Sequence, residues 1–318
     1  MPARLNSGSR IYVAGHRGLV GAAIKRRLEE LGCRNILART KAELDLRDGA
    51  AVDHFFASEK PEYVFLAAAK VGGIMANALE PAVFLYENLA IQTNVIHSAW
   101  KHGASKLLFL GSSCIYPKMA PQPIQESSLL TGPLEETNEA YAIAKIAGLK
   151  MAAAYRAQYG FQAISLMPTN LYGPGDNFDL ETSHVLPALI RRFHEAVATK
   201  AKEVVLWGTG TPRREFLHVT DLAAAACFSM EHYDGTQHLN VGTGEDLTIA
   251  ELAQVVAKVT RYQGKITFDS TKPDGTPRKV LDVSKIRRLG WVPRISLEDG
   301  IVSTYEWYVT HKAKSMAG

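Results

Sequence analysis

The chain has 318 residues, 47% of them hydrophobic, and a formal net charge of +4, which is enough for a large core in one or two lobes. The sequence contains no run of about 18 apolar residues, as a membrane span requires, and no apolar N-terminal stretch typical of a signal peptide. It also lacks a long basic block that would favour binding to nucleic acid or membranes. Three scattered cysteines argue against a disulfide framework and predict a reducing cytoplasmic location, and no residue spacing suits a metal site.

In chain order, short aliphatic runs alternate with helical patterns through the first half of the sequence. Strands are predicted at 11–14, 35–38, 63–66, 106–110 and 163–167, and helices at 22–31, 80–102 and 140–159. This alternation predicts an α/β fold of the Rossmann type, with a doubly wound parallel sheet covered by helices on both faces. After a turn-rich segment near Asn170, helices are predicted at 184–197 and 248–260 and strands at 204–207 and 238–241.

A glycine-rich turn follows the first predicted strand and opens the first predicted helix, as a dinucleotide-binding turn requires. Glycines let the backbone approach a pyrophosphate, and the helix N-terminus supplies N–H groups and a positive dipole. A plain strand–helix turn is the alternative. The residues predicted to bind the cofactor here are Gly15, His16, Arg17, Gly18, Leu19, Val20 and Gly21.

The end of the second predicted strand decides between the two nicotinamide cofactors. An NAD site usually has an acid there for the ribose 2′-hydroxyl, whereas an NADP site has arginine or lysine for the 2′-phosphate. This segment contains Arg39 and Lys41 and no acid before Glu43, and Arg17 adds a further charge. We therefore predict NADP(H). The alternative is that Arg39 and Lys41 are solvated surface charges.

Tyr141 and Lys145 stand four residues apart in a predicted helix and so share one of its faces. A lysine beside a phenol favours the phenolate and lowers a pKa that is about 10 in an unperturbed tyrosine. The hydroxyl of Ser112, upstream, is able to hold a substrate oxygen. The three residues predict a proton relay at a carbonyl or alcohol, although a solvated lysine beside an amphipathic tyrosine has the same spacing.

These motifs, with residues 168–174, resemble the extended short-chain dehydrogenase/reductases that act on nucleotide sugars. Segments 15–18, 67–74, 111–118 and 168–178 look most like the 3,5-epimerase/4-reductases of GDP-4-keto-6-deoxy-D-mannose. The resemblance implies an NADP-binding domain of residues 1–170 with about 215–245, a smaller C-terminal α/β substrate lobe of residues 171–214 and 246–318, and a homodimer. It also implies further cofactor contacts from Leu110, Gly111, Ser113, Lys145, Pro168, Thr169, Asn170, Leu171 and His184.

Cys114 separates this sequence from the related 4,6-dehydratases, in which an Asp-Glu pair stands where Ser113 and Cys114 stand here. A thiol has an unperturbed pKa near 8.5 and serves as a base after a modest shift. The resemblance pairs Cys114 with His184, whose near-neutral pKa suits an acid. From the residues alone, a buried inert cysteine and a capping or surface histidine are the alternatives.

Substrate recognition calls for arginine at a diphosphate and for an aromatic ring against a guanine. The resemblance assigns these roles to Arg192, Trp207, Arg214 and Asp282, with Lys70 as a weaker candidate for lining the sugar site. Small residues are dense between Tyr141 and Tyr159, which fits either a two-fold helix bundle with a second subunit or packing within the chain.

The predicted reaction is the NADPH-dependent epimerisation at C3 and C5 and reduction at C4 of GDP-4-keto-6-deoxy-D-mannose to GDP-L-fucose. Cys114 and His184 act as base and acid, while Ser112, Tyr141 and Lys145 serve the C4 oxygen. Another nucleotide-sugar epimerase or reductase of this family is the first alternative. A non-catalytic NADP-binding sensor is the second, although it predicts a broken proton relay.

Overall fold

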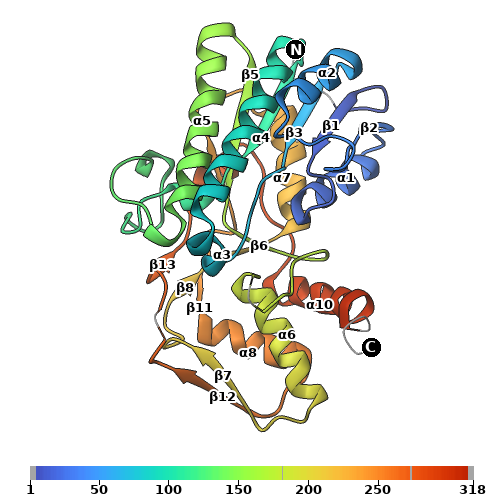
Figure 1. The fold of residues 1–318 in the computed structure, drawn as a ribbon. Helices are drawn as coiled ribbons and strands as arrows, with labels where there is room; N and C mark the ends of the chain where they lie inside the picture. Colours follow the sequence, from blue (N-terminus) through green and yellow to red (C-terminus); the bar gives the residue numbers. More distant parts are fainter. Residues whose placement is uncertain (1–4, 181, 273, 314–318) are drawn as a thin grey trace.

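The computed structural model describes residues 5–180, 182–272 and 274–313 (Figure 1). Residues 1–4 of the predicted cofactor domain lie outside this part, as do Glu181, Pro273 and residues 314–318 of the predicted substrate lobe. Within the described ranges, no helix is both long enough and apolar enough to cross a membrane.

A six-stranded sheet, parallel throughout, forms the larger part of the molecule, with the strand order β10-β5-β4-β3-β1-β2. This architecture confirms the predicted Rossmann-type fold. The predicted and observed strands agree within two residues at each end. The strands are β1 (Arg10–Ala14), β2 (Asn35–Leu37), β3 (Tyr63–Leu66), β4 (Lys106–Leu110), β5 (Gln162–Pro168) and β10 (Leu239–Val241).

Helices cover both faces of the sheet (Figure 1). One face carries α1 (Leu19–Glu30) and α7 (Val219–His232), which pack against each other. The other carries α2 (Gly49–Glu59), α4 (Pro81–Lys101) and α5 (Glu139–Tyr159), with α4 packed against both of the others. The patterns at 22–31, 80–102 and 140–159 are confirmed as helices, whereas α2 and α7 were not predicted.

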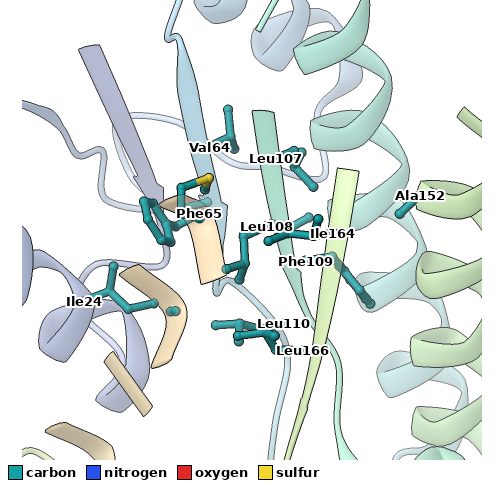
Figure 2. Close-up of a cluster of buried hydrophobic side chains, with 14 of the residues drawn as sticks. Ile24, Val64, Phe65, Leu107, Leu108, Phe109, Leu110, Ala152, Ile164 and Leu166 are labelled. Atoms are coloured by element: carbon teal, nitrogen blue, oxygen red, sulfur yellow. The ribbon is translucent and has the colours of Figure 1, made fainter. Parts of the chain in front are cut away.

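The core of this lobe is built from side chains of the central strands and the helices over them (Figure 2). Val64, Leu108 and Ile164 are almost completely buried, as strands covered on both faces require. Ile24 of α1 and Ala152 of α5 close the core from opposite sides (Figure 2). Each fully buried aliphatic side chain contributes about 1.5–3 kcal/mol relative to leaving it exposed.

A second, smaller core lies below the first in Figure 1. Phe193, Leu252 and Ile301, from three different helices, are among its fully buried members. A capping box starts the predicted helix at 248–260, since Thr248 and Glu251 each accept a hydrogen bond from the other's backbone N–H. The main elements are α6 (Val185–Ala198), β7 (Glu203–Trp207), α8 (Ile249–Thr260), β12 (Lys265–Asp269) and α10 (Leu297–Tyr308).

Short strands connect the two cores. β6 (Asn170–Tyr172) pairs with β9 (Phe216–His218), and β8 (Arg213–Arg214) lies between β11 (Leu247–Thr248) and β13 (Arg278–Lys279). The division into a cofactor domain and a substrate lobe stays a proposal that the two separate cores support. The segment from Leu281 to Trp291 falls within the predicted substrate lobe, but it packs into the first core.

Candidate active site

The glycine turn after β1 has the shape of a phosphate cradle. Gly15 has a φ of +87°, and a Cβ there would lie 2.8 Å from the backbone of Ala68. A Cβ on Gly21 would overlap the carbonyl oxygen of Gly15. Gly18 begins α1 without any side-chain cap, so the first N–H groups of the helix are available to a phosphate. The turn therefore fits the pyrophosphate of a dinucleotide.

The three basic residues predicted to contact the 2′-phosphate differ in their surroundings. Arg39 is half-buried, donates to Glu59 at 2.7 Å and lies over the ring of Phe55. Arg17 and Lys41 are exposed, and neither forms an ion pair with another described residue. Arg17 and Lys41 are thus better placed to bind an added phosphate than Arg39.

The other predicted cofactor residues gather at the carboxyl edge of the sheet, where parallel strands bind ligands. Leu110 and Pro168 end β4 and β5, which are neighbours. The side chains of Thr169 and Asn170 both donate to the backbone oxygen of Glu215. The remaining residues on this edge are Gly111, Ser113 and Leu171, with Leu19 and Val20 in the first turn of α1.

Ser112, Tyr141 and Lys145 come together between β4 and α5. The Ser112 hydroxyl is near enough to the Tyr141 phenol to act on its pKa through hydrogen bonding. The Ser112 oxygen also accepts from the backbone N–H of Cys114 at 3.2 Å, which orients the loop after β4. Lys145 Nζ is buried, donates to the backbone oxygen of Leu110 at 2.9 Å and lies 5.8 Å from the centre of the Tyr141 ring.

The expected effect of Lys145 on Tyr141 is wrong for this structure. Burial raises the pKa of the Tyr141 phenol, and the hydrogen bond from Ser112 offsets this only in part. Burial also lowers the pKa of Lys145 to about 8, so the ammonium is itself disfavoured. Desolvation therefore dominates both side chains, and the phenol stays protonated near neutral pH.

Cys114 is partly exposed, unlike the buried Cys33 and Cys227, which argues against an inert structural role. Its Sγ lies 3.5 Å from Asn138 Nδ2 and 3.6 Å from Lys279 Nζ. Sequence reasoning identified neither neighbour. The available signal for Lys279 was a basic pair, Arg278 and Lys279, standing just before two apolar residues.

His184 is at the N-cap position of α6, but its side chain caps no backbone N–H. His184 is exposed to solvent, yet desolvation by the surrounding protein lowers its pKa and the nearby charge of Lys279 lowers it further. The capping role considered from the sequence is therefore not seen. Lys279 is the common neighbour of Cys114 and His184.

Of the predicted substrate residues, Arg192 and Trp207 lie together. The Arg192 guanidinium stands 5.9 Å from the centre of the Trp207 ring, which is 61% exposed although it is aromatic. Arg214 is half-buried, and burial lowers its pKa despite the nearby carboxylates of Asp274 and Glu135.

In each arginine pair, the other member has a structural partner. Arg191 donates to Glu195 at 2.7 Å, and Arg213 donates to Asp246 at 2.8 Å. These two contacts leave Arg192 and Arg214 as the members outside these ion pairs.

Two further candidates are engaged within the chain. The Asp282 carboxylate accepts from the backbone N–H of Ser284 at 2.9 Å, at the start of α9 (Ser284–Arg288). Lys70 pairs with Glu80 at 3.2 Å and lies over the ring of Phe84. Their substrate roles stay predictions. The described residues include no group of three or more His, Cys, Asp or Glu side chains arranged to hold a metal ion.

Residues 11–242 match the model of the NAD dependent epimerase/dehydratase family. The fold, the glycine turn and the serine–tyrosine–lysine group define the same class, and the chain belongs to that family. This result confirms the resemblance found in the sequence motifs.

Particular relatives narrow the similarity. The chain is 64% identical over 305 residues to a "Probable GDP-L-fucose synthase 1" of Oryza sativa subsp. japonica, covering 96% of this chain and 93% of the relative. It is 57% identical over 315 residues to the GDP-L-fucose synthase of Escherichia coli (strain K12), covering 96% and 98%. A solved structure of a GDP-mannoheptose C4 reductase from Campylobacter jejuni with NADP bound matches with a TM-score of 0.89 and 41% identity, covering 96% and 99%.

Proposed function

We propose that this protein catalyses the NADPH-dependent epimerisation at C3 and C5 and reduction at C4 of GDP-4-keto-6-deoxy-D-mannose to GDP-L-fucose. The observation that carries the proposal is the contact of 3.6 Å between Cys114 Sγ and Lys279 Nζ. Cys114 lies two residues after Ser112 in the sequence. A simple reductase needs only the serine–tyrosine–lysine group. A thiol beside a cation that also perturbs His184 supplies the acid–base pair that epimerisation needs. Identities of 64% and 57% to GDP-L-fucose synthases support this choice.

Epimerisation begins with removal of a proton from C3 or C5, both acidified by the C4 ketone. Cys114 takes that proton as a thiolate, and the Lys279 ammonium at 3.6 Å provides its counter-charge. His184 returns a proton on the opposite face of the sugar. Its lowered pKa makes the protonated imidazole a strong donor.

Ser112 and Tyr141 hold the C4 oxygen in both stages. Their hydroxyls stabilise the enolate oxygen while a proton is absent from C3 or C5. When bound, NADPH supplies the hydride that reduces C4. Tyr141 gives its proton to the C4 oxygen, and the raised pKa of the phenol ensures that this proton is present near neutral pH. Lys145 is anchored on Leu110 beside the Tyr141 ring, where it orients the tyrosine and binds the nicotinamide ribose.

The cofactor binds along the carboxyl edge of the sheet. The turn from Gly15 to Gly21 receives the pyrophosphate, and Arg17 and Lys41 receive the 2′-phosphate. Arg39 contributes charge nearby while it remains paired with Glu59. The cofactor is NADP(H), in agreement with the NADP-bound relative.

The GDP part of the substrate binds in the smaller lobe. Trp207 offers an exposed aromatic face to the guanine, with Arg192 and Lys272 both within 6 Å of the ring centre. Arg214, partly desolvated, pairs with the diphosphate. Asp282 also contributes to substrate binding in this proposal.

The proposal extends to a homodimer in the cytoplasm. Tyr86 of α4 and Ile143 and Tyr159 of α5 are 66%, 45% and 47% exposed, which favours a two-fold interface between these helices. All three cysteines are unpaired, as expected for a protein in a reducing compartment.

One experiment tests the reaction. GDP-4-keto-6-deoxy-D-mannose and NADPH are supplied in heavy water, and the loss of NADPH absorbance is followed with deuterium uptake at C3 and C5. We expect NADPH consumption and deuterium at both carbons. Without any NADPH oxidation the proposal fails, as a non-catalytic NADP-binding sensor would predict. Reduction without deuterium would leave only a 4-reductase, and interconversion without net NADPH consumption would indicate a 4-epimerase.

A further inference from the structure

Glu215 lies at the junction between the two cores, and its side chain is completely buried. It follows β8 and precedes β9, where the chain returns from the smaller lobe to the sheet. Three other passages between the cores come close to it, at residues 169–170, 242–244 and 279–281. A charged side chain at such a place is rare unless it is fully paired.

The carboxylate joins two of these passages. Its Oε1 accepts from the backbone N–H of Gly244 at 2.7 Å and from Thr243 Oγ1 at 3.5 Å. Its Oε2 accepts from the backbone N–H of Leu281 at 2.8 Å. A Cβ on Gly242 would overlap the carboxylate, so the glycine leaves the space that Glu215 occupies.

The backbone of Glu215 binds the passage at residues 169–170 and makes a further hydrogen bond to the passage at 279–281. Its carbonyl oxygen accepts from Asn170 Nδ2 at 2.8 Å and from Thr169 Oγ1 at 3.3 Å. Its N–H donates to the carbonyl oxygen of Lys279 at 3.3 Å. One residue therefore connects the end of β5, the loop after β10 and the segment after β13.

Each carboxylate oxygen accepts from a backbone N–H, and these bonds favour the ionised form of Glu215. Burial acts in the opposite direction and raises the pKa of the group, and the bonds from Gly244 and Leu281 offset that effect only in part. The neighbours of this cluster are functional candidates. Arg214 is adjacent in the chain, and Lys279 accepts from Glu215 while its side chain contacts Cys114.

We propose that Glu215 is a positioning residue that fixes the substrate-side segments, carrying Arg214 and Lys279, against the cofactor edge of the sheet. It contacts neither substrate nor cofactor. Its effect is to hold the binding groups of the smaller lobe at the right distance from the nicotinamide site, so that GDP-sugar affinity depends on it more than NADPH affinity does. The role of GDP-sugar rests on the proposed function, whereas the connection between the passages does not.

Three variants test this inference. Glu215→Gln puts an amide N–H₂ against a backbone N–H and removes the charge, and Glu215→Asp keeps the charge with a shorter side chain. Gly242→Ala presses on the carboxylate without altering Glu215. Glu245→Gln is the matched control, because Glu245 is exposed and lies on the same passage. The measurements are the Kd values of GDP and of NADPH by calorimetry, kcat and KM, and amide hydrogen exchange of segments 242–244 and 279–281.

For Glu215→Gln we expect GDP affinity to fall about tenfold or more, with a matching rise in the KM of the GDP-sugar. NADPH affinity should change by less than about threefold, and amide exchange should accelerate at Gly244 and Leu281. Glu215→Asp should restore part of the GDP affinity. Gly242→Ala should reproduce the Gln result and decides the question if Glu215→Gln does not fold.

Unchanged GDP affinity and amide exchange in folded Glu215→Gln or Gly242→Ala protein would overturn the inference. Equal losses of GDP and NADPH affinity would also overturn it, because they indicate a general structural role. The reaction itself is tested separately. If the wild-type protein binds GDP and NADPH but leaves the keto-sugar unchanged, the proposed function fails, while the GDP affinity and exchange measurements still decide the role of Glu215.

Discussion

The cofactor side and the substrate side of the site are built differently. The proposed cofactor side lies on one continuous parallel sheet, and its residues follow β1, β2, β4 and β5 in short motifs. The proposed substrate side draws Arg192, Trp207, Arg214 and Lys279 from separate segments, and its sheets have only two or three strands. Glu215 joins the passages between them.

This difference indicates where precision comes from in each half. On the sheet, backbone hydrogen bonds between neighbouring strands fix the relative position of the binding loops. In the smaller lobe, few strand pairs are available, so side chains such as Glu215 and the capping residues carry more of that task. Substitutions on the sheet should therefore mainly reduce the rate of the reaction. Substitutions in the smaller lobe should mainly weaken the connections that hold its segments in place.

The largest effect is expected for Tyr141→Phe. Loss of the proton donor should lower kcat for NADPH consumption by about 10²–10⁴-fold, with deuterium exchange at C3 and C5 reduced less because Ser112 still holds the enolate oxygen. Steady-state kinetics in heavy water measure both quantities. Tyr63→Phe, at the start of β3 and so at the opposite end of the sheet from the carboxyl edge, is the control. Activity of Tyr141→Phe within about threefold of wild type would show that the proton comes from another group.

Cys114→Ser should have the next largest effect, on exchange rather than reduction. A serine hydroxyl is a far weaker base than a thiol, so deuterium uptake at C3 and C5 should fall by about 10²-fold or more, while some direct reduction at C4 persists. Mass spectrometry of the product reports the deuterium. Cys33→Ala, in the core of the cofactor lobe, serves as control. Normal exchange in Cys114→Ser would rule out the thiol as the base.

The sequence predicted the cofactor side better than the substrate side, for a physical reason. Local patterns report local structure, and β3 and β4 have the predicted boundaries. The helix α7 was missed because its alanine-rich segment is buried nearly all round and shows no amphipathic stripe. The glycine turn and the Tyr141–Lys145 spacing each lie within one strand–helix unit or one helix.

Contacts between distant segments left little trace in the sequence. Lys279 meets Cys114 across 165 positions, and Glu215 meets Leu281 across 66. No periodicity or spacing rule connects residues so far apart. The pKa of Tyr141 was mispredicted for a similar reason, since its direction depends on burial by the whole fold and not on the residue four positions away.

Lys279→Met should slow deuterium exchange less than Cys114→Ser does, and it should also shift the pH profile of that exchange. Lys279 is the second cause, after burial, of the lowered pKa of His184, so its removal should raise that pKa toward its ordinary value. The limb of the exchange pH profile that reports protonated His184 should therefore move to higher pH. The exchange rate should fall about tenfold as the thiolate loses its counter-charge. Lys279→Arg keeps the charge and should keep the limb in place, whereas an identical shift in both variants would contradict the electrostatic explanation.

A smaller effect still is expected from the combined changes Arg17→Ala and Lys41→Ala. Both side chains are exposed, so the lost contacts with the 2′-phosphate should reduce the preference for NADPH over NADH by about tenfold, with kcat little altered. Ratios of kcat/KM for the two cofactors at two salt concentrations measure this. Arg34→Ala, another exposed arginine, is the control. An undiminished preference would assign the phosphate contact to Arg39 or remove it from this loop.

The smallest effect compares one helix cap from each lobe. Thr248 Oγ1 accepts from the N–H of Glu251 at 3.0 Å in α8, and Asp48 Oδ1 accepts from the N–H of Ala51 at 3.0 Å in α2. Loss of either cap, as Thr248→Ala or Asp48→Ala, should cost about 1 kcal/mol. If the smaller lobe is held mainly by a few side-chain connections, Thr248→Ala should accelerate amide exchange in α6 and α8 alone and leave NADPH affinity unchanged.

Asp48→Ala should affect the other lobe, with faster amide exchange in α2 and unchanged exchange in α6 and α8. Hydrogen exchange followed by mass spectrometry resolves these helices as separate peptides. Acceleration of the same peptides in both variants would mean that the two cores open as one cooperative unit. In that case the smaller lobe would share the stability of the sheet. Glu215 would then only align the substrate-side segments, without contributing to the stability of the smaller lobe.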